Sequence, residues 1–266
     1  MRRARDTERI SAGKHEQPMT FANPFQAPFS SPFSPKLSVT ALFDPSSISG
    51  LIGWFDFSDS ANIFTDTGMT TPVASDGDLI AAAKDKSGSA HHYTQSNSLK
   101  RPTWKTAIKN GRAIGRGNGT SAQLIKDPWT GLAVPLTFIC VASRTTTSGT
   151  GTIWGAQPYV RFDNAGRISM SDGTLLQSAT SVYTTNTFYI LSFVFNGASS
   201  AIYKNGSSLA SGAAGSSTVT FTALFSAYDA NYLSGDIGEI YVYNSALSDA
   251  NRQACENGLN TKWAAY

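Results

Sequence analysis

The sequence is poor in charged residues and has no dense run of one sign. Asp, Glu, Lys and Arg make up 15% of the 266 residues, and the formal net charge is +3. Lysine and arginine are scattered along the chain, whereas nucleic-acid-binding proteins gather them in a basic patch or stripe. The charge pattern therefore argues against a nucleic-acid partner.

Cysteine is also scarce, because Cys140 and Cys255 are the only two and neither belongs to a Cys-x-x-Cys pair. This excludes a fold held together by several disulfides and gives no support for a zinc site. Cys140 lies inside the apolar run 136–142, and reduced cysteines are among the most buried residues. We expect two buried free thiols, although a disulfide between them stays open at this point.

Long apolar runs are missing. The longest, from Phe188 to Phe195, is interrupted by Ser192 and is too short to cross a membrane. The N-terminal residues 1–6 are basic, but the apolar stretch of a signal peptide does not follow them. We therefore expect a soluble protein that is made in a cytoplasm and has no membrane partner.

Common catalytic motifs are absent too: Gly-x-Ser-x-Gly, His-Glu-x-x-His and a phosphate-binding glycine loop with lysine. A glycosidase needs two carboxyls at a defined separation, whereas Glu239 stands alone in its predicted strand, where we expect it at the rim or facing solvent. His91 and His92 are adjacent, so on an extended chain they point to opposite faces and are poorly placed to share a metal ion. We predict no enzymatic activity and no cofactor.

What the sequence does contain begins with an unusual N-terminal region. Residues 1–17 are polar, with five Lys or Arg against three Asp or Glu, and are expected to be flexible or ordered by a partner. In residues 18–45 the pair Pro-Phe recurs every four residues, and proline restricts itself and the preceding residue to extended geometry. This arm either packs along its own domain or inserts phenylalanine side chains into a partner. The candidate partner-anchoring residues are Phe21, Phe25, Phe29 and Phe33.

Residues 46–266 have the pattern of one β-rich domain. The runs 136–142 and 188–195 are almost continuously apolar, which is typical of strands buried on both faces. Residues 159–170 predict a hairpin around a polar turn. Residues 201–209 predict another around Asn-Gly, the strongest short signal for a two-residue hairpin turn.

The C-terminal part supplies one more strand and the one convincing helix. Residues 237–243 alternate in character, and Ser248 can cap a helix that runs from about 249 to 263, although Gly258 weakens it. Many strands with a single terminal helix predict an all-β fold. We expect a two-sheet antiparallel β-sandwich, or jelly roll, with an extended N-terminal arm and a short C-terminal helix.

Four stretches follow one another along the chain in a familiar order: Gly50–Asp59; Asp85–Tyr93 with Arg101–Trp104; Ala201–Gly206; and Gly235–Ser248, which leads to Lys262-Trp263. This order resembles the concanavalin A-like lectin/glucanase superfamily, in the laminin-G-like branch common in bacterial surface and bacteriophage proteins. The resemblance implies two antiparallel sheets, one of them concave. It implies no single function, because this fold carries lectins, glycosidases and structural modules.

The chain departs from that family at two points. The glucanases of the superfamily carry Glu-x-Asp-x-x-Glu on one strand, and this sequence has no such motif. The family often has Phe-Asp-Gly where this chain has residues 114–120, which contain no acidic side chain. A Ca²⁺ site inherited with the fold would therefore lack a ligand here.

Binding chemistry has better support, because sugars are held by aromatic faces and by polar side chains that loops usually supply. Residues 226–232 are the most suggestive segment. The alternative interpretation of this segment is an ordinary β-turn with exposed tyrosines. The candidate glycan-binding residues are Trp129, Trp154, Tyr159, Asp163, Asn164, Tyr228, Asp229, Asn231 and Tyr232. Trp54, Trp104 and Trp263 are expected in the core.

These observations together predict a non-enzymatic accessory protein of a bacteriophage virion, as capsid decoration, head fibre or tail-associated protein. It would attach to other virion proteins through residues 18–45 and present a domain that binds host-surface polysaccharide. The alternative is a carbohydrate-binding module of a bacterial surface protein, and a third hypothesis is a polysaccharide-cleaving enzyme. Because fibre and decoration proteins are often cyclic, a homo-oligomer is also open.

Overall fold

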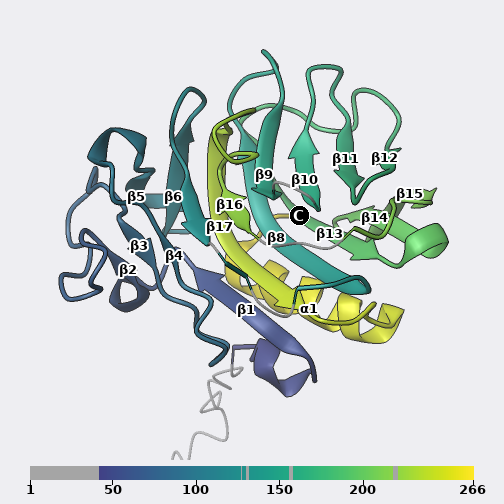
Figure 1. Cartoon of the computed structure of the whole chain (residues 1–266), viewed down its shortest axis with the longest axis horizontal. Helices are drawn as coiled ribbons and strands as arrows, with labels where there is room; N and C mark the ends of the chain where they lie inside the picture. Colours follow the sequence, from purple (N-terminus) through teal and green to yellow (C-terminus); the bar gives the residue numbers. More distant parts are fainter. Residues whose placement is uncertain (1–41, 127, 130–131, 156–157, 218–220) are drawn as a thin grey trace, which may run out of the picture. The chain divides into compact units, whose positions relative to one another are not determined.

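The computed structural model describes residues 42–266, apart from 127, 130–131, 156–157 and 218–220. In this range the chain forms two antiparallel β-sheets, and the helix α1 (Asp249–Trp263) packs against one of them (Figure 1). The predicted all-β sandwich with a C-terminal helix is thereby confirmed. Residues 1–41, with the four predicted anchors Phe21, Phe25, Phe29 and Phe33, lie outside the described residues.

Sheet A carries the helix. Its strands follow the order β15-β14-β13-β8-β17-β6-β5, and β1 pairs with the second half of β17. Their bounds are β1 (Leu51–Asp56), β5 (Thr103–Lys109), β6 (Arg112–Asn118), β8 (Leu136–Arg144), β13 (Phe188–Phe195), β14 (Ser200–Lys204), β15 (Ser207–Gly212) and β17 (Ser234–Tyr243).

Sheet B closes the other side of the core in the order β12-β11-β10-β9-β16-β7-β4-β3-β2. Its strands are β2 (Ile63–Phe64), β3 (Ala82–Ala83), β4 (Tyr93–Thr94), β7 (Leu124–Lys126), β9 (Gly151–Gly155), β10 (Tyr159–Phe162), β11 (Ile168–Ser171), β12 (Leu175–Gln177) and β16 (Thr222–Leu224). The described part of the chain also contains four short 3₁₀ helices: η1 (Pro45–Ser47), η2 (Ser60–Asn62), η3 (Ser98–Lys100) and η4 (Gly197–Ser199).

The central strands of sheet A are buried on both faces, as their apolar runs predicted. On β8, Phe138 and Cys140 belong to the core between the sheets, whereas Ile139 and Val141 belong to the core beneath α1. Because neighbouring side chains of a strand point to opposite faces, a strand covered on both sides has few positions for polar residues. This explains why β8 and β13 are almost continuously apolar.

The local signals of turns and caps also hold. Strands β10 and β11 form the first predicted hairpin, and β14 and β15 form the second. In the second turn Asn205 and Gly206 have φ values of 51° and 82°, the left-handed pair that a tight hairpin turn needs. Helix α1 begins after Ser248, whose hydroxyl accepts a hydrogen bond from the Asn251 N–H. Within the described residues, no helix has the length and apolar character to cross a membrane.

Gly258 lies inside α1, where a glycine costs helix stability, and its packing explains its presence. A Cβ atom added there would lie 2.4 Å from the Cβ and Cγ atoms of Phe43, so this side chain lies directly on the helix backbone. A second contact holds the segment 43–45, because the Tyr243 hydroxyl donates a hydrogen bond to the Pro45 carbonyl at 2.9 Å. Residues 43–45 are therefore packed against α1 and β17.

Cys140 and Cys255 are both free and fully buried, so the expectation of buried thiols is confirmed. Burial raises the pKa of the Cys140 thiol, and burial raises the pKa of the Cys255 thiol to about 11. Because the thiolate is the reactive form, neither residue should react with a thiol reagent in the folded protein at neutral pH. A chromogenic thiol assay should give no signal before unfolding and two thiols after it; rapid native labelling would contradict this burial.

Candidate functional site

Several strand connections meet at one end of the sandwich, which we call the loop end. Strand β17 begins beside the last residues of β6 and β8, since Ser234 pairs with Asn118 and Gly235 pairs with Arg144. The connections before and after these strands must therefore lie close together. The loop end consists of residues 95–102, 119–123, 145–150, 163–167, 178–187 and 225–233.

The connection 225–233 has an unusual backbone. Phe225, Tyr228, Asp229 and Asn231 have φ values of 66°, 54°, 60° and 49°. Residues with a Cβ atom pay a steric cost in this left-handed region, and the cost is best tolerated by asparagine and aspartate. Such a conformation persists only where the surrounding structure holds it, and residues of this kind gather at functional sites.

Asp229 is the residue that holds this loop. Its Oδ1 atom accepts hydrogen bonds from the Lys100 Nζ at 2.5 Å, from the Gln123 side-chain amide at 2.7 Å and from the Tyr232 hydroxyl at 3.2 Å. Gln123 in turn accepts from the Asp229 N–H and from the Ser226 hydroxyl. The hydrogen bond from Lys100 contributes most to lowering the pKa of Asp229, which favours the ionised carboxylate that these three donors need.

A groove of about 450 Å³ lies between this loop and its neighbours. Its lining residues are Asn118, Gly119, Thr146, Ser148, Gly149, Thr150, Asn231, Tyr232 and Ser234. Close to them in the chain, Tyr228 is 38% exposed and its ring lies 4.6 Å from that of Phe221, measured between centroids. The loop end thus combines amide and hydroxyl groups with an accessible aromatic side chain, the usual materials of a sugar-binding site.

Arg144 ties the other loops of this end together. Its side chain is buried, and its Nη1 donates to the Asp163 carbonyl and the Tyr183 hydroxyl, both at 3.0 Å. Its Nη2 donates to the carbonyls of Ser148 and Gly149. Burial lowers the pKa of this guanidinium, but an arginine side chain keeps its charge in proteins. One cation therefore links connections 145–150, 163–167 and 178–187.

Most of the predicted glycan-binding residues come together at the loop end: Asp163, Asn164, Tyr228, Asp229, Asn231 and Tyr232. Asp163 is occupied by its own turn, because its Oδ1 accepts from the N–H groups of Ala165 and Arg167. Tyr159 lies instead at the start of β10, where the Arg161 guanidinium lies 4.5 Å from the centroid of its ring.

We predicted that Trp129 and Trp154 could face a ligand, and the structure corrects this prediction. Both are fully buried between the sheets, where Trp154 stacks on Phe138 with ring centroids 4.8 Å apart and Trp129 stacks on His91 at 4.7 Å. Large apolar rings gain most by leaving water, and these two fill the core. Of the tryptophans expected in the core, Trp104 and Trp263 are buried and Trp54 is half-buried.

The predicted position of Glu239 is also corrected. Only 1% of this residue is exposed, and it lies under α1 rather than at a rim. Its Oε1 accepts from Trp54 Nε1 at 2.9 Å and from the Tyr241 hydroxyl at 3.2 Å. Its Oε2 accepts from Lys262 Nζ at 2.7 Å and from Trp263 Nε1 at 2.9 Å. Burial, followed by the nearby Asp56 carboxylate, raises the pKa of Glu239.

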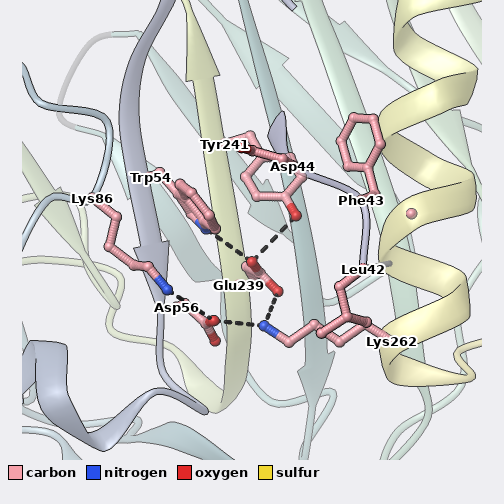
Figure 2. Close-up of a pocket in the computed structure, with 10 residues that line it drawn as sticks. Leu42, Phe43, Asp44, Trp54, Asp56, Lys86, Glu239, Tyr241 and Lys262 are labelled. Carbon is pink, nitrogen blue, oxygen red and sulfur yellow. Dashed lines mark hydrogen bonds and ion pairs between the residues drawn. The ribbon is translucent and has the colours of Figure 1, made fainter. Parts of the chain in front are cut away.

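Glu239 belongs to a charge cluster that also contains Asp56, Asp59, Lys86 and Lys262. Figure 2 shows the Lys262 ammonium between the two buried carboxylates, 2.6 Å from Asp56 and 2.7 Å from Glu239. Lys86 bonds to Asp59 at 2.6 Å and lies 3.5 Å from Asp56. The cluster borders a pocket of about 300 Å³, and its contacts join β1, β17 and α1. Because protein donors engage both Glu239 oxygens, we interpret the cluster as a clamp for α1.

Comparison with known proteins finds similarity in structure but not in sequence. No protein-family model matches the chain, and no curated protein matches it in sequence. Among solved structures, the binding domain of Paraclostridial Mosquitocidal Protein 1 is similar over 80% of this chain and 53% of its own, with 12% identity and a TM-score of 0.54. This likeness shows the fold alone.

Two further structures are similar at TM-scores below 0.5, which is too low to support a conclusion about this chain. A Trypanosoma rangeli sialidase has 10% identity and a TM-score of 0.49 over 81% of this chain. The ligand binding domain of botulinum neurotoxin serotype D, in complex with N-acetylneuraminic acid, has 12% identity and a TM-score of 0.45 over 68% of this chain. This chain spans 33% of the sialidase and 50% of the neurotoxin domain.

Proposed function

We propose that this domain is a carbohydrate-binding module that recognises a glycan with its loop end and does not cleave it. The observation that carries the proposal is the left-handed backbone of connection 225–233, held by Asp229 beside a groove of amide and hydroxyl groups. A loop fixed before its ligand arrives loses little conformational entropy on binding. The strain therefore supports a binding function at this position.

The arrangement of the two ends of the sandwich supports the same function. Strand β1 begins beside Tyr243, the last residue of β17, whereas the loop end adjoins Ser234, the first residue of β17. Residues 43–45 therefore enter the domain far from the groove. A module connected in this way presents its binding loops away from the segment that leads into it.

The charge cluster supports binding without cleavage. Glycoside hydrolysis needs one carboxyl that donates a proton and a second that acts as nucleophile or base. Here Asp56 and Glu239 are the buried pair that share a pocket, and a single ammonium bonds to both of them. Glu239 also accepts three more hydrogen bonds from the chain, which leaves it poorly suited to deliver a proton.

The wider setting of the module rests on the sequence. A carbohydrate-binding module suits a bacterial surface protein, and it also suits the virion accessory protein that the N-terminal arm suggested. Attachment through residues 18–45 and a place in a virion remain predictions, and most of that segment lies outside the described residues. Absence of this protein from purified virions of its source would contradict the proposal that it is a virion protein.

The proposal is tested by measuring binding of the full chain to a panel of immobilised polysaccharides. Asp229→Ala removes the acceptor that holds the loop, so we expect affinity for the bound polysaccharide to fall about tenfold or more, the equivalent of one or two hydrogen bonds. Tyr159→Ala, on the face of sheet B, is the matched control and should bind like the unaltered chain. A folded chain that binds no polysaccharide would contradict the proposal, and loss of binding in the control alone would move the site to sheet B.

A further inference from the structure

The groove at the loop end is lined entirely by uncharged groups. Its nine residues are two glycines, two serines, two threonines, two asparagines and one tyrosine. None of them carries a formal charge. A ligand that enters the groove therefore meets hydroxyls, amides and one aromatic ring.

Two cations of the loop end, Lys100 and Arg144, are already engaged by the protein. Lys100 is bonded to Asp229, and the same carboxylate oxygen accepts from Tyr232, which lines the groove. Arg144 is 1% exposed, and both of its terminal nitrogens donate to oxygen atoms of the chain. Among the described residues, the lining of the groove therefore offers an anion no cation.

This arrangement discriminates by charge. A carboxylate or sulfate that leaves water without a cationic partner pays a large desolvation cost, whereas sugar hydroxyls exchange water for the hydroxyl and amide groups of the groove at little cost. From this balance we infer that the groove takes an uncharged glycan, built of neutral hexose or N-acetylhexosamine units. The inference deepens the proposed function and rests on it.

The groove also separates side chains that shape it from side chains that face the ligand. The Asn118 Oδ1 accepts from the N–H groups of residues 120–122, and Ser234 is bonded to Thr145. Within the described part of the chain, no hydrogen bond engages the side chains of Ser148, Thr150 or Asn231. Asn231 is exposed, and its amide offers both donors and an acceptor, which match a pair of neighbouring sugar hydroxyls. Asn231 is therefore the principal specificity-determining residue of the groove.

The test compares neutral with acidic polysaccharides. The full chain is applied to immobilised dextran, mannan, galactan and chitin oligomers, and to polysialic acid, polygalacturonate and dextran sulfate, at low and high ionic strength. We expect binding to at least one neutral polymer with an affinity that salt leaves unchanged, because no ion pair is formed. Asn231→Ala should weaken that binding about tenfold or more, whereas Asn196→Ala, an exposed asparagine that follows β13 at the opposite end of the sandwich, should leave it unchanged.

The outcomes separate this inference from the proposed function. Binding confined to the acidic polymers and lost at high salt would overturn the neutral specificity and leave the module a glycan binder. Neutral binding that survives Asn231→Ala would overturn the role of the groove. A chain shown by circular dichroism to be folded, yet bound by no polymer of either class, would overturn the proposed function itself.

Discussion

Glu239→Ala is expected to lower the free energy of unfolding by about 3–5 kcal/mol, the usual cost of breaking a buried ion pair by removing one partner. The substitution leaves the buried ammonium of Lys262 with Asp56 as its remaining acidic partner. It also leaves the N–H groups of Trp54 and Trp263 without the acceptor they have in the folded chain. Urea denaturation monitored by tryptophan fluorescence measures the change.

Two further variants make this prediction specific to the cluster. Asp249→Ala removes a carboxylate from α1, the helix that carries Lys262, but its side chain is 75% exposed, so its salt bridge to Arg252 should contribute no more than about 1 kcal/mol. The double variant Glu239→Ala and Lys262→Met should lose less free energy of unfolding than the sum of the two single variants. The reason is that Lys262→Met removes the buried ammonium that Glu239→Ala leaves without one of its two carboxylate partners. Additive losses, or a Glu239→Ala change no larger than that of Asp249→Ala, would contradict the clamp.

The sequence predicted well those features that depend on neighbouring residues. The Asn205-Gly206 turn requires two left-handed residues, and Ser248 supplies the acceptor that begins α1. The apolar runs that became β8 and β13 identified strands covered on both faces. Each of these signals lies within a few residues of the structure it determines, so no long-range information was needed.

The face of sheet A on which Glu239 lies depends on a β-bulge in β17. The alternation of residues in the sequence does not reveal this bulge. Strict alternation along β17 would place Glu239 on the same face as Ile237, which belongs to the core between the sheets. The register shifts between these two residues, at Gly238, and such a bulge turns the following side chains to the other face. A Cβ atom at Gly238 would lie 2.8 Å from the Trp263 ring, so the glycine also makes room for α1. Glycine within a strand was the one signal that could have indicated the bulge.

The candidate site was predicted in part for a related reason. Asp229, Asn231 and Tyr232 stood out because polar and aromatic residues gathered in one loop, whereas Lys100 and Gln123, which hold that loop, come from connections far away in the sequence. Trp129 and Trp154 carried no local sign of burial. Which loops meet, and which rings turn inward, follows from the pairing of strands that are distant along the chain.

The connections at the loop end also depend on Arg144, whose guanidinium is buried without a carboxylate within ion-pair distance in the described residues. Burying an isolated charge is costly, so its removal relieves desolvation at the same time as it removes hydrogen bonds. The carbonyls of Asp163, Ser148 and Gly149 would lose a charged donor together. The effect on the arrangement of the loops should therefore exceed the effect on overall stability.

Arg144→Met keeps most of the apolar volume of the side chain and removes all of these bonds. We expect the free energy of unfolding to fall by about 1–3 kcal/mol, since hydrogen bonds to charged groups are worth about that much each and the relieved desolvation offsets part of the loss. Hydrogen exchange should accelerate in residues 145–150 and 163–167 while β8 and β13 stay protected, and glycan affinity should fall about tenfold or more because the groove is no longer preset. Arg161→Met, which removes a half-buried arginine beside Tyr159, is the matched control and should change neither the exchange of residues 145–150 nor the glycan affinity. Unaltered exchange at 145–150 together with full glycan affinity would show that the loop end does not depend on the buried cation.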